Sequence, residues 1–264
     1  MVWLEAVLAS AIGYLLGSIS FTGIAIRYFA TEEQRAKIQH PSIQTGEEER
    51  EPIYGAYTTN RVWGAKVGIG ISLLDMLKVG LPMWIFKVYL YPGEYYFLLV
   101  SVAGLIGHNW PIYFGFKGGR GVAVVMASFF VIDWLGAIAI PFLSAILGLM
   151  VFRNIGIAYF GSTILMFPWL WLRTYDLFFL LWAFAVVVIM YIAMLPDRRA
   201  GKRIEAEKGE DAKDEAMDAL LPGTVGMRSA VERLESLGIK KYGVSLLGLI
   251  ILVVVFWFLP FLPF

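Results

Sequence analysis

Long apolar runs separated by short polar connections dominate the chain. The first run covers roughly residues 2–28, and a polar stretch over 29–66 follows it. The next two runs, 67–91 and 95–113, are separated only by Pro92-Gly93-Glu94 and therefore predict an antiparallel helical hairpin. Because the first run is too long for the hydrophobic part of a signal peptide, we interpret it as a retained transmembrane helix.

The second half of the chain continues this pattern. The apolar stretch over 122–151 contains Asp133 and Pro141. Two short helices that meet near Asp133 fit it better than one long helix, since a charge at mid-bilayer costs several kcal/mol. Three further apolar runs follow, over residues 155–172, 177–195 and 244–264. A charged segment over 196–243 precedes the last of these runs.

Composition supports the same interpretation. Hydrophobic residues make up 59% of the 264 residues and charged residues only 16%, which is typical of a polytopic membrane protein. The absence of cysteine excludes disulfides, and the two histidines give no indication of a metal site. The net charge of +1 gives no indication of nucleic-acid binding. We predict an all-α transmembrane bundle, with a core over 1–195, a charged cytoplasmic segment over 196–243 and a C-terminal transmembrane helix over 244–264.

The distribution of positive charge predicts an orientation. If the apolar helices alternate in direction, 19 of the 22 Lys and Arg residues fall on one side of the membrane. Because positive residues concentrate on the cytoplasmic side, this predicts a multi-pass cell-membrane protein with its N-terminus outside and its polar motifs facing the cytoplasm.

The most distinctive polar segment runs from Gly107 to Ala123. An apolar helix ends near His108, and the following loop, which we call the glycine loop, carries two cations and four glycines: Lys117, Arg120, Gly115, Gly118, Gly119 and Gly121. Uncovered amide groups, two cations and a helix predicted to begin near Gly121 suit a phosphate. The alternative is a tight, positively charged loop that faces anionic lipid.

Two other groups of charges lie on the same predicted face. Arg61 and Lys66 precede the second helix and are either phosphate contacts or membrane-surface anchors. Asp75 and Lys78 are three residues apart on one helical face, so each can neutralise the other. They form either a structural pair or a substrate contact.

These motifs together resemble the bacterial integral-membrane glycerol-3-phosphate acyltransferases that use acyl phosphate as donor. The matching pieces keep the family's order over about residues 10–195: Tyr14-Leu-Leu-Gly-Ser-Ile19, Gly55-Ala56 with Arg61 through Gly68, Asp75-Met-Leu-Lys78, and Gly107-His108 with Pro111 and Phe116-Lys-Gly-Gly-Arg-Gly-Val-Ala123.

The resemblance implies a seven-helix core, to which the run over 244–264 adds an eighth span, and a membrane acyltransferase of phospholipid biosynthesis. The implied reaction moves a fatty acyl group from acyl phosphate to glycerol 3-phosphate and gives lysophosphatidic acid. It needs no cofactor and no metal, and besides the two substrates we expect membrane lipids as partners. The implied catalytic residues are Arg120, His108 and Arg61, and the implied substrate-binding residues are Lys117, Gly118, Gly119, Gly121, Asp75, Lys78 and Ser18.

Two roles fit His108. It is a conventional base near the glycine loop, or it caps the helix end and orients the loop. The class of acyltransferases that uses acyl-CoA or acyl carrier protein is disfavoured. That class needs a histidine followed, after four intervening residues, by an aspartate. In this chain that position is Tyr113 after His108 and Thr45 after His40.

The chain also departs from the family pattern. Glu51 replaces a serine, Arg120 replaces a lysine, Gly156 replaces a serine, and Pro196-Asp-Arg-Arg-Ala200 aligns with an Arg-His-x-x-Asn motif. Nearby cations are candidates to compensate: Arg198, Arg199, Lys202 and Arg203. The departures leave a second hypothesis open, a catalytically silent relative that binds membrane lipid or acts as a scaffold.

Overall fold

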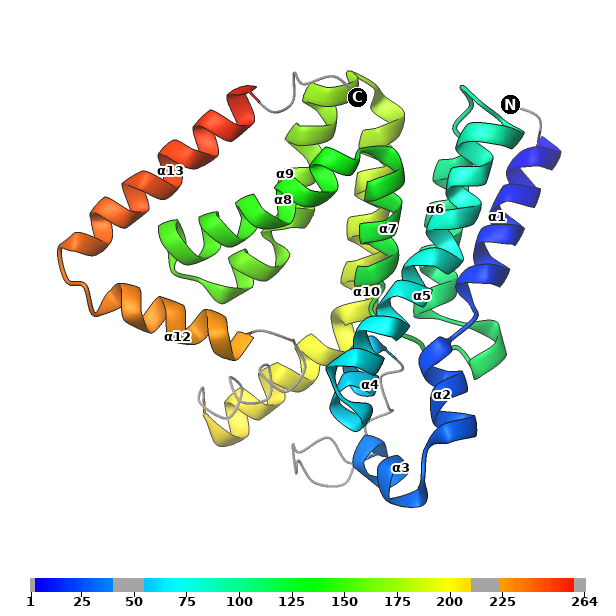
Figure 1. Ribbon diagram of the computed structural model, residues 1–264, viewed down its shortest axis with the longest axis horizontal. Helices are drawn as coiled ribbons and strands as arrows, with labels where there is room; N and C mark the ends of the chain where they lie inside the picture. Colours follow the sequence, from blue (N-terminus) through cyan, green and yellow to red (C-terminus); the bar gives the residue numbers. More distant parts are fainter. Residues whose placement is uncertain (1–2, 40–54, 210–223, 259–264) are drawn as a thin grey trace. The chain divides into compact units, whose positions relative to one another are not determined.

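The computed structural model describes residues 3–39, 55–209 and 224–258, and every regular element in these ranges is a helix (Figure 1). Within the described ranges, seven helices are long and apolar enough to cross a membrane. An eighth apolar helix, α7 (Val122–Ile132), is shorter, with 11 residues. The predicted all-helical membrane architecture is therefore confirmed.

The chain divides into two compact units. Unit 1 comprises residues 1–131 and 185–221, and unit 2 comprises 132–184 and 222–264. The elements of unit 1 are α1 (Trp3–Gly17), α2 (Phe21–Phe29), α3 (Glu32–Gln39), α4 (Ala56–Trp63), α5 (Ala65–Ile85), η1 (Phe86–Leu90), α6 (Tyr96–Asn109), η2 (Ile112–Phe114) and nearly all of α7. Those of unit 2 are α8 (Trp134–Ile146), η3 (Leu147–Phe152), α9 (Ile155–Thr174), α12 (Thr224–Glu235) and α13 (Lys240–Phe258), and α10 (Leu177–Lys208) belongs to both. The division into segments 1–195, 196–243 and 244–264 stays a prediction.

Glycines bring α1 and α6 into close contact in unit 1. A Cβ atom on Gly17 would overlap the backbone of Gly104, and one on Gly13 would overlap the backbone of Val100. One turn further along α6, a Cβ atom on Gly107 would overlap the carbonyl oxygen of Tyr14. Small residues allow such close approach of helix backbones, and van der Waals packing stabilises helix pairs in lipid.

The first apolar run is long and apolar enough to cross a membrane over Trp3–Phe29, as predicted, but it is not one continuous helix. α1 ends at Gly17 and α2 begins at Phe21, with Ser20 as its N-cap: the Ser20 hydroxyl accepts a hydrogen bond from the Gly23 amide at 3.0 Å. The break leaves the carbonyl group of Ile19 free to accept a hydrogen bond from Lys78 at 2.7 Å. The run is apolar throughout, so hydropathy alone conceals this break.

The other helix predictions have mixed outcomes. The hairpin predicted around residue 93 is formed by α5, η1 and α6, and α7 and α8 meet at Asp133 as predicted. The helix expected to end near Leu195 instead continues through Pro196 to Lys208. Proline weakens the preceding turn but does not prevent a helix whose later residues, such as Arg198 and Arg199, are good helix formers.

A buried ion pair connects two helices of unit 2. Arg173 near the end of α9 donates hydrogen bonds to both carboxylate oxygens of Asp133, at 3.0 and 3.2 Å, and Trp169 donates to the same carboxylate at 2.7 Å. The side chains of Asp133 and Arg173 are 0% and 2% exposed. Asp133 also precedes the first residue of α8, where a negative charge suits the helix dipole.

The C-terminal helices of unit 2 are held at a few points. Gly248 of α13 lies against Met150 and Val151 of η3, and Ser245 donates a hydrogen bond to the Met150 carbonyl at 2.8 Å. Glu235 at the end of α12 pairs with Arg153 and with Lys241. The hydrogen bond from Lys241, helped by the charges of Lys241 and Arg153, lowers the pKa of the Glu235 carboxyl group.

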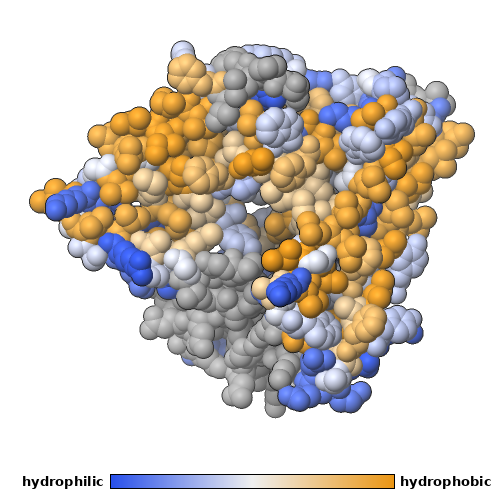
Figure 2. Space-filling view, in the orientation of Figure 1, coloured by the Kyte–Doolittle hydropathy of each residue, from blue (hydrophilic) through white to orange (hydrophobic). Residues whose placement is uncertain are grey.

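Large apolar side chains cover much of the surface of the described helices, as expected for helices that face lipid (Figure 2). They include Leu73, Leu77 and Leu81 along α5, which are 53%, 56% and 51% exposed. Because a soluble protein rarely exposes such large contiguous apolar surfaces, the exposure supports a membrane environment.

We predict that Gly17→Ala lowers the stability of unit 1 by about 1–3 kcal/mol, because the added methyl group has no space against the Gly104 backbone. Thermal unfolding in detergent measures this loss. Gly70→Ala is the matched control, since nothing lies within 4 Å of the Cβ position at Gly70, and it should be neutral or stabilising by up to about 1 kcal/mol. Equal melting temperatures for the two variants would contradict the proposed packing.

Candidate active site

The glycine loop folds back onto the end of α6. The Gly119 amide donates a hydrogen bond to the His108 carbonyl oxygen at 3.1 Å, and the Phe116 amide donates to the Pro111 carbonyl oxygen at 2.9 Å. Gly118 and Gly119 are buried, whereas Lys117 is exposed. The predicted start of the next helix is confirmed, because α7 begins at Val122.

The glycines of the loop are required by contact with the helix end. A Cβ atom on Gly118 would overlap the His108 carbonyl oxygen, and one on Gly119 would overlap Nε2 of the His108 imidazole. Gly121 has φ +78°, and a Cβ atom there would lie 2.8 Å from Oδ1 of Asn109. The expectation that these glycines leave their amide groups uncovered was wrong for Gly119, whose N–H already donates to His108.

Beneath the loop, the ammonium group of Lys78 is surrounded by three acceptors. It lies 2.8 Å from Oδ1 of Asp75, 2.7 Å from the Ile19 carbonyl oxygen and 3.0 Å from Nδ1 of His108. The side chains of Asp75, Lys78 and His108 are all less than 10% exposed. Lys78 thus hydrogen-bonds to the Ile19 carbonyl oxygen and to Nδ1 of His108, and it forms an ion pair with Asp75. This favours the interpretation of Asp75 and Lys78 as a structural pair.

This arrangement assigns the proton of His108. An ammonium group only donates hydrogen bonds, so Nδ1 of His108 must accept, and a neutral imidazole then carries its hydrogen on Nε2. Nε2 is the ring atom beside Gly119. In this tautomer His108 presents a donor to the glycine loop and has no lone pair on that side to act as a base. The geometry therefore favours an orienting and hydrogen-bonding role.

Arg120 forms an ion pair with Asp197 of α10. Its Nε donates to Oδ2 at 2.5 Å and its Nη2 donates to Oδ1 at 2.7 Å. The two side chains are 25% and 24% exposed, so the pair lies at the edge of the packed interior. Charge-assisted contacts with two parallel hydrogen bonds are among the stronger polar contacts in proteins. Asp197 is a partner that the sequence motifs did not indicate.

The remaining predicted site residues lie elsewhere in unit 1. Ser18 is fully buried where α1 packs on α6, and a Cβ atom on Gly107 would lie 3.0 Å from its hydroxyl oxygen. Arg61 lies in α4, although its side chain is outside the described part of the structure, as are Glu51 and His40. Their roles stay predictions.

Sequence reasoning missed Asn109, the last residue of α6. The residue is 3% exposed, and neither the nitrogen nor the oxygen of its side-chain amide has a hydrogen-bond partner in the described ranges. A buried amide without partners is costly and marks a place where a water or a ligand group fits. Its position directly after His108 was the available signal.

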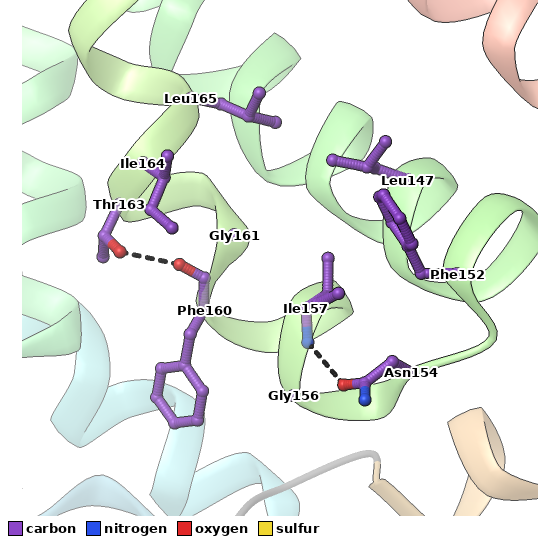
Figure 3. A pocket seen from close by; sticks show the side chains of 10 residues that line it. All are labelled: Leu147, Phe152, Asn154, Gly156, Ile157, Phe160, Gly161, Thr163, Ile164 and Leu165. Atoms are coloured by element: carbon purple, nitrogen blue, oxygen red, sulfur yellow. Dashed lines mark hydrogen bonds between the residues drawn. The ribbon is translucent and has the colours of Figure 1, made fainter.

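Unit 2 contains a separate hollow of about 470 Å³ between η3 and α9 (Figure 3). Its polar lining residues are engaged locally: Asn154 Oδ1 accepts from the Ile157 amide at 3.0 Å, and the Thr163 hydroxyl donates to the Phe160 carbonyl at 2.7 Å. No charged side chain lines it. The hollow therefore suits hydrocarbon and offers nothing to a phosphate.

We predict that Lys78→Met lowers stability by about 3–5 kcal/mol, because it leaves the buried Asp75 carboxylate without a counter-charge. The double variant Asp75→Leu/Lys78→Met removes both charges and should lose less than Lys78→Met alone. Unfolding in detergent, followed by circular dichroism, compares the two. A double variant less stable than the single variant would show that the pair is not coupled as described.

Comparison with known proteins identifies a family that the chain matches. The profile of the glycerol-3-phosphate acyltransferase family matches residues 7–201. A glycerol-3-phosphate acyltransferase of Shouchella clausii is 40% identical over 113 residues, which cover 42% of this chain and 49% of that protein. One from Pseudomonas paraeruginosa is 39% identical over 123 residues, 47% of this chain and 56% of that protein. In these alignments the chain spans about half the length of the curated relatives it matches.

A solved structure shares the fold. It is PlsY (YgiH), an integral membrane glycerol 3-phosphate acyltransferase, in its glycerol 3-phosphate form, with a TM-score of 0.58 and 25% sequence identity over 78% of this chain and 94% of that chain. The lysophosphatidic acid form gives the same TM-score at 24% identity, covering 74% of this chain and 90% of that one. The matched profile covers well over half of the sequence, and the chain therefore belongs to the glycerol-3-phosphate acyltransferase family.

Proposed function

We propose that the protein transfers a fatty acyl group from acyl phosphate to the 1-hydroxyl group of glycerol 3-phosphate. The products are lysophosphatidic acid and inorganic phosphate. The observation that carries this proposal is the pairing of donors at the glycine loop: Nε2–H of His108 lies beside Gly119, and the Arg120 guanidinium follows at the next position. Membership of the family and the named substrate of its relatives support the choice of glycerol 3-phosphate.

The chemistry requires charge stabilisation more than a nucleophilic side chain. The hydroxyl oxygen of the acceptor forms a bond to the acyl carbon, the bond between that carbon and the phosphate oxygen breaks, and phosphate leaves with the electron pair. The acyl phosphate is already activated, so the protein must mainly hold two anions together and stabilise the leaving phosphate. Arg120 and the Nε2–H of His108 supply donors of the required kind.

The proton of the acceptor hydroxyl needs a destination. His108 presents a hydrogen on Nε2 and shares Nδ1 with Lys78, so it has no free acceptor atom. A phosphate oxygen of a substrate is the acceptor that remains, and we propose that it takes the proton. Lys117 is exposed in the loop and is a further candidate to attract the phosphates.

We further propose that the N-terminus lies outside the cell and that the glycine loop faces the cytoplasm. The charge distribution supports this orientation, since Arg198, Arg199, Lys202 and Arg203 extend along the polar end of α10 in the same unit as the loop. Both proposed substrates carry phosphate, and cations on this face favour their approach.

A lipid-binding or scaffolding protein without catalytic activity is the second candidate function. The observation that favours it is the Arg120–Asp197 pair, which neutralises the main cation of the loop. Purified protein incubated with acyl phosphate and labelled glycerol 3-phosphate separates the two. Labelled lysophosphatidic acid supports the enzyme. No product, together with no effect of Arg120→Ala on phosphate binding, supports the alternative.

We predict that Gly119→Val lowers the transfer rate by about 100-fold or more, because its side chain displaces the His108 imidazole from the loop. Gly70→Val is the matched control, as nothing lies within 4 Å of its Cβ position. Melting temperatures in detergent establish that both variants are folded. Full activity of a folded Gly119→Val variant would show that contact between His108 and the loop does not serve the reaction.

A further inference from the structure

The Arg120–Asp197 pair uses only one edge of the guanidinium group. Nε and Nη2 donate to the two carboxylate oxygens of Asp197. A guanidinium group carries five N–H donors in a rigid plane, so the edge formed by Nη1 and Nη2 keeps three hydrogens. Arg120 has no other hydrogen-bond or ion-pair partner among the described residues. This second edge is therefore a planar fork that is still available.

The carboxylate fixes where that fork points. A lone arginine on a loop samples many rotamers and loses this freedom when it binds a ligand. Two parallel hydrogen bonds to Asp197 hold the plane of the Arg120 guanidinium before any ligand arrives. Asp197 itself lies in α10, 77 residues away in sequence, so the orientation is imposed by an element outside the loop.

A lysine at position 120 would not bind both the Asp197 carboxylate and a phosphate group in the same way. Its ammonium group is a point charge without a planar second edge, whereas arginine can bind a carboxylate on one edge and a phosphate on the other. The two side chains are 25% and 24% exposed, so the pair is accessible from solvent.

We propose that Asp197 is a positioning residue that holds Arg120 so that the free edge of its guanidinium binds the phosphate group of a substrate. This inference rests on the proposed function and names the residue on which the loop's phosphate contact depends. The ligand chemistry is a terminal phosphate, which acyl phosphate and glycerol 3-phosphate share. Kinetics with each substrate varied in turn identify which of the two Arg120 binds.

The test is a double-mutant cycle of Arg120→Lys, Asp197→Asn and their combination in the full chain. Asp197→Asn should raise KM for one substrate about tenfold and change kcat less than about threefold, as expected when an oriented phosphate contact is weakened. In the Arg120→Lys background the same change should raise KM by less than about twofold, because the fork is already lost. Glu207→Gln, an exposed carboxylate on the same helix, is the matched control.

Three results would overturn the proposal. Effects of the two substitutions that multiply in the combined variant would show that Asp197 acts independently of Arg120. A lower melting temperature for Asp197→Asn with both KM values unchanged would show that the pair only joins α10 to the loop. A decrease in KM would have the same force, since it would mean that Asp197 competes with the phosphate.

The inference and the proposed function can fail separately. Stabilisation of each variant by inorganic phosphate, measured as a shift in melting temperature, reports phosphate binding without any acyl transfer. If the unmodified protein forms no lysophosphatidic acid, the proposed reaction is wrong. If Asp197→Asn reduces the phosphate-dependent shift only when Arg120 is present, the result still supports the positioning role of Asp197. If the full shift persists in all variants, the result contradicts that role.

Discussion

A buried ammonium group determines the geometry of the candidate site. Because desolvation makes an unpaired buried charge very costly, Lys78 must find acceptors, and it finds them on three elements: Asp75 on its own helix, Ile19 in the break between α1 and α2, and His108 at the end of α6. Through Lys78, the break in the first apolar run is connected to His108 at the end of α6, whose tautomer depends on the same ammonium group. The tight glycine contacts between α1 and α6 bring these elements close enough for this network.

The network reaches the glycine loop through His108, whose two ring nitrogens then have different tasks. Nδ1 accepts from Lys78, and Nε2 faces Gly119, where no side chain fits. The loop therefore packs against the end of α6 and does not present an open set of amide groups. In the proposed function, the side chains of His108 and Arg120, and not the loop amides, supply the donors for an anion. Asp197 of α10 gives the second of these a fixed orientation.

Hydropathy and charge predicted most of the architecture, because lengths of apolar runs and exposed cations are local properties of the sequence. The pairing of Asp75 with Lys78 was predictable for the same reason, as both lie on one turn of helix. The break at Ser18–Ser20 was not predictable in this way. It exposes the Ile19 carbonyl oxygen to Lys78, and these two residues are 59 positions apart in the sequence. The partner of Arg120 was equally hidden, because a helix predicted to stop near Leu195 would not have placed Asp197 within it.

The central claim is that Lys78 holds His108 as the neutral tautomer with its hydrogen on Nε2. Nitrogen-15 magnetic resonance of protein labelled at histidine tests this directly, and His40→Gln leaves His108 as the only signal because the chain has two histidines. With Lys78 as the donor, we predict one protonated ring nitrogen, Nε2, and an unprotonated Nδ1 that accepts a hydrogen bond. A hydrogen on Nδ1, or hydrogens on both nitrogens, would contradict the account.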